Sequence, residues 1–396
     1  MPDVDTGEIL HLQSDFPPVP TAAWEAAITK DLKGADYEKR LVWRTEEGLA
    51  LRPYYRKEAL AGLDEQLHST PDRYPFVRGT GRPWEIAQDA KPGPKAIRAD
   101  LLHESGAHAI QELGYGIAAG VERLAELTAT LPVDTIASQV EFIFAVGPSY
   151  FIEIAKLRAA RMLWAQAVSA FGATDETACR MRLHVRTPRR NKSTYDRYTN
   201  LLRATTEALS AAVGGCDSLT VDPFGFEPHL AENVQHILKE ESHLDAVADP
   251  AGGSYYIEAL TDLLAREAWK LFQQVEAQGG YAAATASGSI DKALAETRAA
   301  RAKALLVAPA RAGGRQQLSQ PDGEGARRRV SPVRQPHRRT VREDPPPHHR
   351  TRTNHGPLSQ GPPVHSRRRE DEGRTGQLLA QLFRMCRFRY RAIRPL

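Results

Sequence analysis

The chain has 396 residues and a formal net charge of +4, and 41% of its residues are hydrophobic. That length allows two or three domains, or one α/β barrel of about 250 residues with further segments. The three cysteines have neither paired nor metal-type spacing, which excludes a disulfide framework. No apolar run approaches the ~18 residues of a membrane span, and no charged-then-apolar leader opens the chain. We therefore expect a cytoplasmic protein without a membrane segment or a metal site.

The charge is unevenly distributed along the chain. Residues 305–396 contain 20 Arg, no Lys, 11 Pro and seven acidic residues, a net charge of +13, so residues 1–304 carry −9. A segment rich in Arg and Pro cannot bury enough apolar surface to offset the entropy of ordering it. We predict three parts: an N-terminal arm and linker over 1–96, a folded region over 97–304 and a disordered basic tail over 305–396.

The N-terminal arm shows little regular periodicity. The pattern predicts a short helix over 24–33, ended by Gly34, and a strand or hairpin over 41–55. Residues 78–84 are typical of a loop, and the sequence KPGPK at 91–95 interrupts regular structure.

Short apolar strands alternate with longer helices in the folded region. We predict strands at 140–146, 181–185 and 218–221, and helices at 107–127, 150–171, 196–213, 230–241 and 256–277. This alternation indicates βαβ units and a parallel sheet. A barrel and a doubly wound sheet both fit the pattern.

Four segments of this region, in this order, resemble the catalytic barrel of the methylmalonyl-CoA mutase family. They are Gly106–Leu113 (GAHAIQEL), Phe151–Arg161 (FIEIAKLRAAR), Glu207–Gly215 (EALSAAVGG) and Ala248–Tyr255 (ADPAGGSY). Tyr74–Gly79 and Arg82–Trp84 resemble the segment that leads into the family's barrel. The resemblance covers most of residues 20–304 and is specific because the segments occur together.

The resemblance implies a (β/α)8 barrel of the TIM type that binds acyl-CoA, joined to a flavodoxin-like domain that binds adenosylcobalamin. The implied reaction is an isomerisation, the radical rearrangement of methylmalonyl-CoA to succinyl-CoA. The cofactor supplies the radical chemistry, and the protein supplies positioning and a dry cavity. Active-site groups are expected just after Val146, Val185 and Val221, and near Asp249, because barrel enzymes carry them on loops after the strands.

The sequence departs from the family at the cofactor. The cobalamin signature Asp-x-His-x-x-Gly is absent, and the one His-x-x-Gly, His103–Gly106, has Leu101 where the aspartate should be. We interpret that match as chance. The histidine of the catalytic type is also expected at Leu101 and is missing there.

The substrate loop departs as well. The pattern His-x-Gln-Thr-Ser-Gly corresponds here to His184–Arg189, with Arg186 in place of Gln and Pro188-Arg189 in place of Ser-Gly. The following Asn191–Tyr198 resembles the small subunit of heterodimeric mutases. We therefore expect a chain that is inactive alone and acts in a heterodimer with a catalytic, cobalamin-carrying subunit.

The barrel is expected to be incomplete. Eight βα units of about 30 residues need roughly 240 residues, and residues 97–304 are fewer and match the later part of the family's barrel. The step from Trp84 to Ile97 therefore skips early units. Such a barrel would expose strand edges and apolar core, which predicts poor solubility.

Several polar residues are candidates to face a substrate or cofactor, although no catalytic residue is assigned. Arg186, Arg189 and Arg190 could hold CoA phosphates or lie in solvent or an interface. Glu153 with Lys156, and Arg158 with Arg161, are expected to pair on a helix surface. The candidates facing substrate or cofactor are His184, Arg186, Thr187, Asn191, Lys192, Tyr195, Asp222, Asp249, Gly252 and Gly253.

Two interpretations of the tail remain open. A genuine Arg-rich tail would bind nucleic acid or another polyanion through phosphate contacts, and this is the alternative function. A tail without Lys is also typical of a GC-rich message read in the wrong frame. Codons exist for Leu382–Tyr390 that, read one nucleotide later, give Phe-Phe-Gly-Cys-Ala-Gly-Phe-Asp, which resembles the family's entry into its cobalamin domain. The nucleotide sequence of the gene distinguishes the two.

Overall fold

The computed structural model describes residues 17–88 and 91–307. Its centre is a parallel sheet of five strands in the spatial order β3-β7-β6-β5-β4. The strands are β3 (Glu85–Ile86), β4 (Ala96–Arg98), β5 (Glu141–Ala145), β6 (Arg182–Arg186) and β7 (Ser218–Thr220). The predicted parallel α/β architecture is confirmed. Of the basic tail, residues 308–396 lie outside the described part of the chain.

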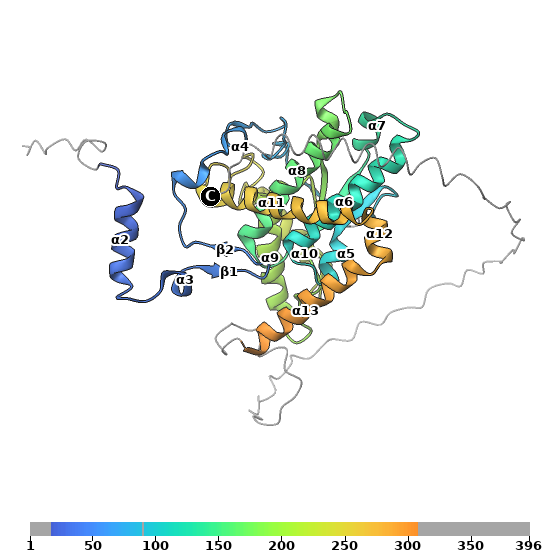
Figure 1. Cartoon of the computed structure of the whole chain (residues 1–396). Coiled ribbons are helices and arrows are strands. Elements are labelled where there is room, and N and C mark those ends of the chain that lie inside the picture. The colour runs from blue at the N-terminus through green and yellow to red at the C-terminus, as the bar shows by residue number, and fades with distance from the viewer. Residues whose placement is uncertain (1–16, 89–90, 308–396) are drawn as a thin grey trace, which may run out of the picture.

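Helices connect the strands and cover one face of the sheet (Figure 1). Between β4 and β5 lie α5 (Ala99–Glu104), α6 (Ala109–Thr128) and α7 (Val133–Ala137). Between β5 and β6 lie α8 (Tyr150–Ala170) and the short η2 (Glu176–Cys179), and α9 (Arg197–Val213) connects β6 to β7. The remaining helices follow β7 as α10 (Pro228–His236), η3 (Ile237–Glu241), α11 (Tyr255–Ala277), α12 (Tyr281–Ala286) and α13 (Ser289–Val307).

The apolar core lies between the sheet and its helices. Alternate residues of a strand point to opposite faces, and Phe142 and Phe144 of β5 both point to the helical side. The Phe142 ring contacts Trp164 of α8 edge-on, with ring centroids 4.7 Å apart. A Cβ atom at Gly120 of α6 would lie 2.4 Å from Phe142 Cζ. The close approach of α6 to the sheet therefore requires glycine at this position.

The opposite face of the sheet is largely polar. The strand register places Arg98, Ile143, His184 and Ser218 in one row across β4, β5, β6 and β7. Most apolar side chains of the strands are buried, whichever face they lie on. The expected exposure of apolar core is therefore wrong for the described strands, whereas poor solubility stays a prediction.

The strand order identifies where the barrel is incomplete. β3 and β4 follow one another in sequence, but they form opposite edges of the sheet. β3 pairs with β7, as the first strand of a closed barrel pairs with the last. Among the described residues neither edge strand has a second partner. The fold is thus a partial TIM-type barrel, open between β3 and β4, as the predicted step from Trp84 to Ile97 requires.

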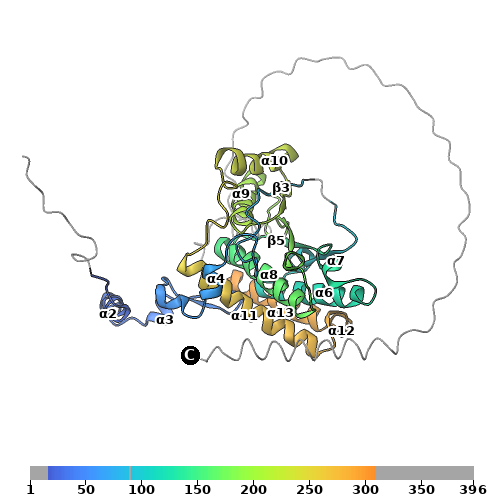
Figure 2. The same cartoon turned by 90° about the horizontal axis from the view of Figure 1, so that it is seen from above.

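The N-terminal arm precedes the barrel, and its first part extends away from it. It contains α2 (Thr21–Asp31), α3 (Tyr37–Arg40), an antiparallel hairpin of β1 (Trp43–Arg44) and β2 (Ala50–Leu51), η1 (Lys57–Leu60) and α4 (Asp64–His68). The predicted helix and hairpin are confirmed. Neither α2 nor α3 has a buried residue, and α2 stands apart from the barrel in both views (Figures 1 and 2).

Candidate functional site

A cavity of about 630 Å³ lies at the carboxyl ends of β4, β5 and β6. Each strand contributes the residues that follow it: His103 after β4, Ser149 after β5 and the run 190–195 after β6. Glu46 and Glu47 of the arm and Arg301 of α13 complete the wall. This is the end of a barrel at which substrates bind.

A chain of buried charges lies beside the cavity. Glu112 of α6 is fully buried and accepts from Lys156 Nζ at 2.7 Å and from the backbone N–H of Ala145 at 2.7 Å. Its third close partner is His103, with Nδ1 3.0 Å from Glu112 Oε2. Lys156 Nζ also lies 2.5 Å from Glu153 Oε2. These groups join the helices α5, α6 and α8 to the end of β5.

The charges of these buried residues stabilise one another. Burial alone would raise the pKa of Glu112, but Lys156 and His103 more than offset it and lower that pKa to about 2. Burial likewise works against the Lys156 ammonium, and the carboxylates of Glu112 and Glu153 outweigh it, so that its pKa is raised. Lys156 and Glu112 are therefore both charged at neutral pH.

The loop after β6 is held by a second buried carboxylate. Glu207 of α9 accepts hydrogen bonds from Asn191 Nδ2 and Lys192 Nζ. Burial raises the pKa of Glu207 and lowers that of Lys192, although each attracts the other's charge. Asn191, Lys192 and the exposed Tyr195 line the cavity, so three candidates from the sequence lie together there.

Four more candidates lie in or just beyond the strands. His184 is buried in β6, with Nδ1 2.7 Å from Ser218 Oγ and Nε2 3.2 Å from Thr220 Oγ1. Burial lowers the pKa of His184 to about 4. Arg186 ends the same strand. Thr187 Oγ1 accepts from the backbone N–H of Asp222, the fourth candidate, at 2.8 Å. None of these four residues lines the cavity.

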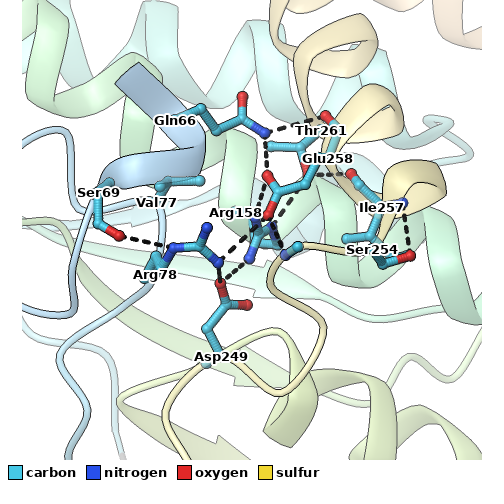
Figure 3. A network of polar contacts seen from close by, with 12 residues as sticks. Gln66, Ser69, Val77, Arg78, Arg158, Asp249, Ser254, Ile257, Glu258 and Thr261 are labelled. Carbon is cyan, nitrogen blue, oxygen red and sulfur yellow. Dashed lines mark hydrogen bonds and ion pairs between the residues drawn. The ribbon is translucent and has the colours of Figure 1, made fainter. Parts of the chain in front are cut away.

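Asp249 belongs to a separate network (Figure 3). Gly252 and Gly253 lie in the turn that follows it, in which the Gly252 N–H donates to Asp249 O at 2.8 Å. Asp249 Oδ2 lies 2.9 Å from Arg78 Nη1 and also contacts Arg158 Nη1. Arg158 Nη2 lies 2.7 Å from Glu258 Oε2, and Glu258 Oε1 accepts from the Gly253 backbone N–H at 2.8 Å. This network fastens the end of the arm to α8 and α11, and it does not line the cavity.

The expectation that charged pairs of α8 lie on a helix surface is wrong. The side chains of Lys156 and Arg158 are fully buried, and those of Glu153 and Arg161 nearly so. Arg161 donates to four backbone oxygens, among them Phe76 O at 3.0 Å and Gly214 O at 2.8 Å. These residues hold the barrel and arm together from inside.

The sequence analysis missed His103, Glu112 and Arg190 as one cluster. The i,i+3 spacing of Glu153 and Lys156 is the same for a buried and an exposed pair. The partner that distinguishes the two, Glu112, lies on another helix. One signal was present: Glu112 is the one acidic residue in the helical segment 107–121.

Neither His103 nor His184 is free to ligate the cobalt of cobalamin. Both ring nitrogens of His103 are engaged, Nδ1 by Glu112 and Nε2 by Arg190, and those of His184 by Ser218 and Thr220. Within 17–88 and 91–307, no three His, Cys, Asp or Glu side chains are grouped so as to hold a metal ion. In the same residues, no helix is both long and apolar enough to cross a membrane.

The fold and the cavity define a class: a (β/α) barrel protein with a charged cavity at the strand ends. A sequence profile described as Methylmalonyl-CoA mutase matches residues 93–309. The chain belongs to the methylmalonyl-CoA mutase family.

Several curated relatives are similar to the chain. The methylmalonyl-CoA mutase small subunit of Porphyromonas gingivalis is 34% identical over 415 aligned positions, which cover 72% of this chain and 67% of that protein. The small subunit of Streptomyces virginiae is 44% identical over 54% of this chain and 36% of its own length. The methylmalonyl-CoA mutase of Escherichia coli is 38% identical over 52% of this chain and 30% of its own length. The chain thus spans about a third of the last two proteins.

The first alignment bears on the open barrel. Its 415 positions exceed the 396 residues of the whole chain. It therefore includes positions of the relative that have no counterpart here, in agreement with a barrel that lacks units.

Proposed function

We propose that this chain is the non-catalytic subunit of an adenosylcobalamin-dependent acyl-CoA mutase, which converts methylmalonyl-CoA to succinyl-CoA. The observation that carries the proposal is the similarity to the Porphyromonas gingivalis small subunit across 72% of the chain. The loop after β6 supports it, because Arg186 and Pro188-Arg189 stand where the catalytic type has Gln and Ser-Gly.

The partner in this proposal is a large, catalytic subunit. Large subunits from Porphyromonas gingivalis and Streptomyces virginiae, the organisms of the two small subunits above, are also similar to this chain. The extended arm offers a surface for such a partner, since Trp24 and Trp43 are about half exposed there. Large exposed aromatic side chains of this kind are enriched in protein interfaces.

The cobalamin belongs to the partner in this proposal, and the chain is inactive alone. Radical intermediates require a cavity from which water is excluded. One feature argues against such a cavity here: the sheet is open between β3 and β4. We also propose a cytoplasmic location, which the free thiols of Cys179 and Cys216 support.

The test is an assay of succinyl-CoA formation with adenosylcobalamin and methylmalonyl-CoA. The chain is assayed alone, the Porphyromonas gingivalis large subunit alone, and the two together after gel filtration. We expect no turnover by the chain alone and co-elution with the large subunit. Turnover by the chain alone would refute the non-catalytic role, and the absence of any complex would refute the partnership.

A further inference from the structure

The positive groups around the cavity differ in whether they have a counter-ion. Arg301 contacts both carboxylate oxygens of Glu46, at 2.8 and 3.0 Å, and Lys192 pairs with Glu207. For Arg190 and Arg203, no carboxylate oxygen of the described residues lies within 4.0 Å of the guanidinium. The Arg203 group donates instead to Asn200 Oδ1 at 2.9 Å. Two cavity-lining cations therefore lack a negative partner.

Contacts with Glu104 and His103 hold Arg190 in place. The backbone N–H groups of Arg189 and Arg190 donate to the Glu104 carboxylate at 2.7 and 3.0 Å. Because Glu112 is a carboxylate, the proton of His103 lies on Nδ1, and His103 Nε2 accepts from Arg190 Nη2 at 3.2 Å. The series of contacts from Lys156 through Glu112 to His103 thus orients the Arg190 guanidinium.

One donor of this guanidinium has no acceptor. Arg190 Nη1 is shielded from solvent and makes no hydrogen bond. A buried donor without a partner costs about 1–3 kcal/mol. Burial and the neighbouring Arg301 lower the pKa of Arg190, and they outweigh the carboxylates of Glu46, Glu112 and Glu104, which raise it. A negatively charged ligand would relieve both costs.

The acidic groups of the cavity do not offset these cations. Glu46 is paired with Arg301, and Glu153 with Lys156. Burial raises the pKa of Glu47, which favours its neutral form. The cavity therefore has an excess of positive charge.

We propose that Arg190, with Arg203 lining the same cavity, binds a small oxyanion, a carboxylate or phosphate, at the carboxyl ends of the strands. The guanidinium fork suits both groups, since each presents two oxygens to parallel N–H donors. The three arginines predicted to bind phosphate differ in their surroundings. Arg189 is mostly exposed and pairs with Asp222 at 2.8 Å, and Arg186 does not line the cavity. This site does not depend on the proposed subunit role.

The test is isothermal titration of the full chain with sodium phosphate and with sodium succinate, at ionic strength fixed with chloride. We expect saturable binding of at least one anion, and at least tenfold weaker binding by Arg190→Gln. Arg189→Gln is the matched control and should bind within about twofold of the parent, because its guanidinium already has a carboxylate partner. Phosphate binding alone would assign a phosphate-bearing ligand, and succinate binding alone a carboxylate.

Two outcomes would overturn the proposal: no heat above that of sodium chloride with either anion, or equal binding by Arg190→Gln and the parent. Arg190→Lys covers the case in which Arg190→Gln does not fold. It keeps the charge but loses the fork, so it should bind at least fivefold more weakly than the parent, with an unchanged circular dichroism spectrum. Full affinity in Arg190→Lys would overturn the assignment of the guanidinium.

Discussion

Substitution of Glu112 should lower the free energy of unfolding. Glu112→Gln removes the negative charge between His103 and Lys156, both of which are buried. Breaking a buried ion pair costs about 3–5 kcal/mol, and Lys156 keeps Glu153 as a partner, so we expect a loss of about 3 kcal/mol. Urea unfolding measures it.

The matched control for this change lies on the same helix. Glu126 pairs with Arg123 at the surface of α6, with both side chains exposed. Glu126→Gln should change the free energy of unfolding by no more than about 0.5 kcal/mol. Equal losses in the two variants would show that the buried pair adds nothing to stability.

His184 predicts a pH dependence of stability. Its pKa is lowered from 6.5 to about 4 in the folded chain, so between these values the unfolded state binds a proton that the native state excludes. Stability is therefore fully present above pH 6.5 and falls as the pH decreases toward 4, by up to about 3 kcal/mol. His108 shifts in the same direction and adds to the slope.

His184→Gln separates the two contributions. We expect a shallower loss of stability between pH 6.5 and 4 in this variant, measured by urea unfolding at several pH values. His68→Gln, on the exposed end of α4, should reproduce the slope of the parent. A His184→Gln slope identical to that of the parent would exclude His184 as its source.

At the scale of elements, the junction between the arm and the barrel depends on one glycine. A Cβ at Gly252 would lie 1.9 Å from Arg78 Nη1. Arg78 cannot move aside easily, because it donates to Ser69 O, Leu67 O and Asp249 Oδ2, each at 2.9 Å. We expect Gly252→Ala to cost about 1–3 kcal/mol and to loosen the arm.

Limited proteolysis measures that loosening. Gly252→Ala should be cleaved within residues 50–80 faster than the parent. Gly93→Ala is the control, since a Cβ at Gly93 would meet no atom within 4 Å. Cleavage of the arm at the same rate in Gly252→Ala and the parent would show that this junction does not depend on Gly252.

The elements that sequence analysis predicted are those with a strong local pattern. The apolar run at 140–146, followed by Gly147-Pro148, predicted β5, and the amphipathic repeats predicted α6, α9 and α11. The predicted helix at 150–171 is α8, but it is buried on most sides and is not amphipathic. β3 and β4 were missed because two or three residues carry no period. Helix α13 was missed because its polar and apolar residues are mixed around the helix. Three predicted candidates, Asn191, Lys192 and Tyr195, lie together at the cavity because they are local to one loop. His103 and Arg301, which also line it, meet only in the fold.

At the scale of the whole molecule, the first 34 residues, which include α2, should be dispensable for folding and required for assembly. The contacts of α2 are confined to the arm: Trp24 stacks on Tyr54 with ring centroids 5.2 Å apart, and Thr21 donates to Glu58. A chain without residues 1–34 should therefore melt within about 2 °C of the parent, as expected for loss of exposed groups.

The same truncation tests the partner surface. We expect the shortened chain to lose co-elution with a large mutase subunit on gel filtration. Retained co-elution would show that the interface lies outside residues 1–34. A much lower melting temperature would show that these residues support the fold.

The opening between β3 and β4 explains how such a chain still has one sheet. A closed barrel is a ring in which every strand has two neighbours, and removing any contiguous block from a ring leaves a single unbroken strip. The same removal from the middle of an open sheet would leave two separate pieces. Here the ladder β4-β5-β6-β7-β3 stays continuous because the pairing of the last strand with the first survives. Circular closure thus makes this architecture tolerant of the loss of whole units, wherever along the chain the loss occurs.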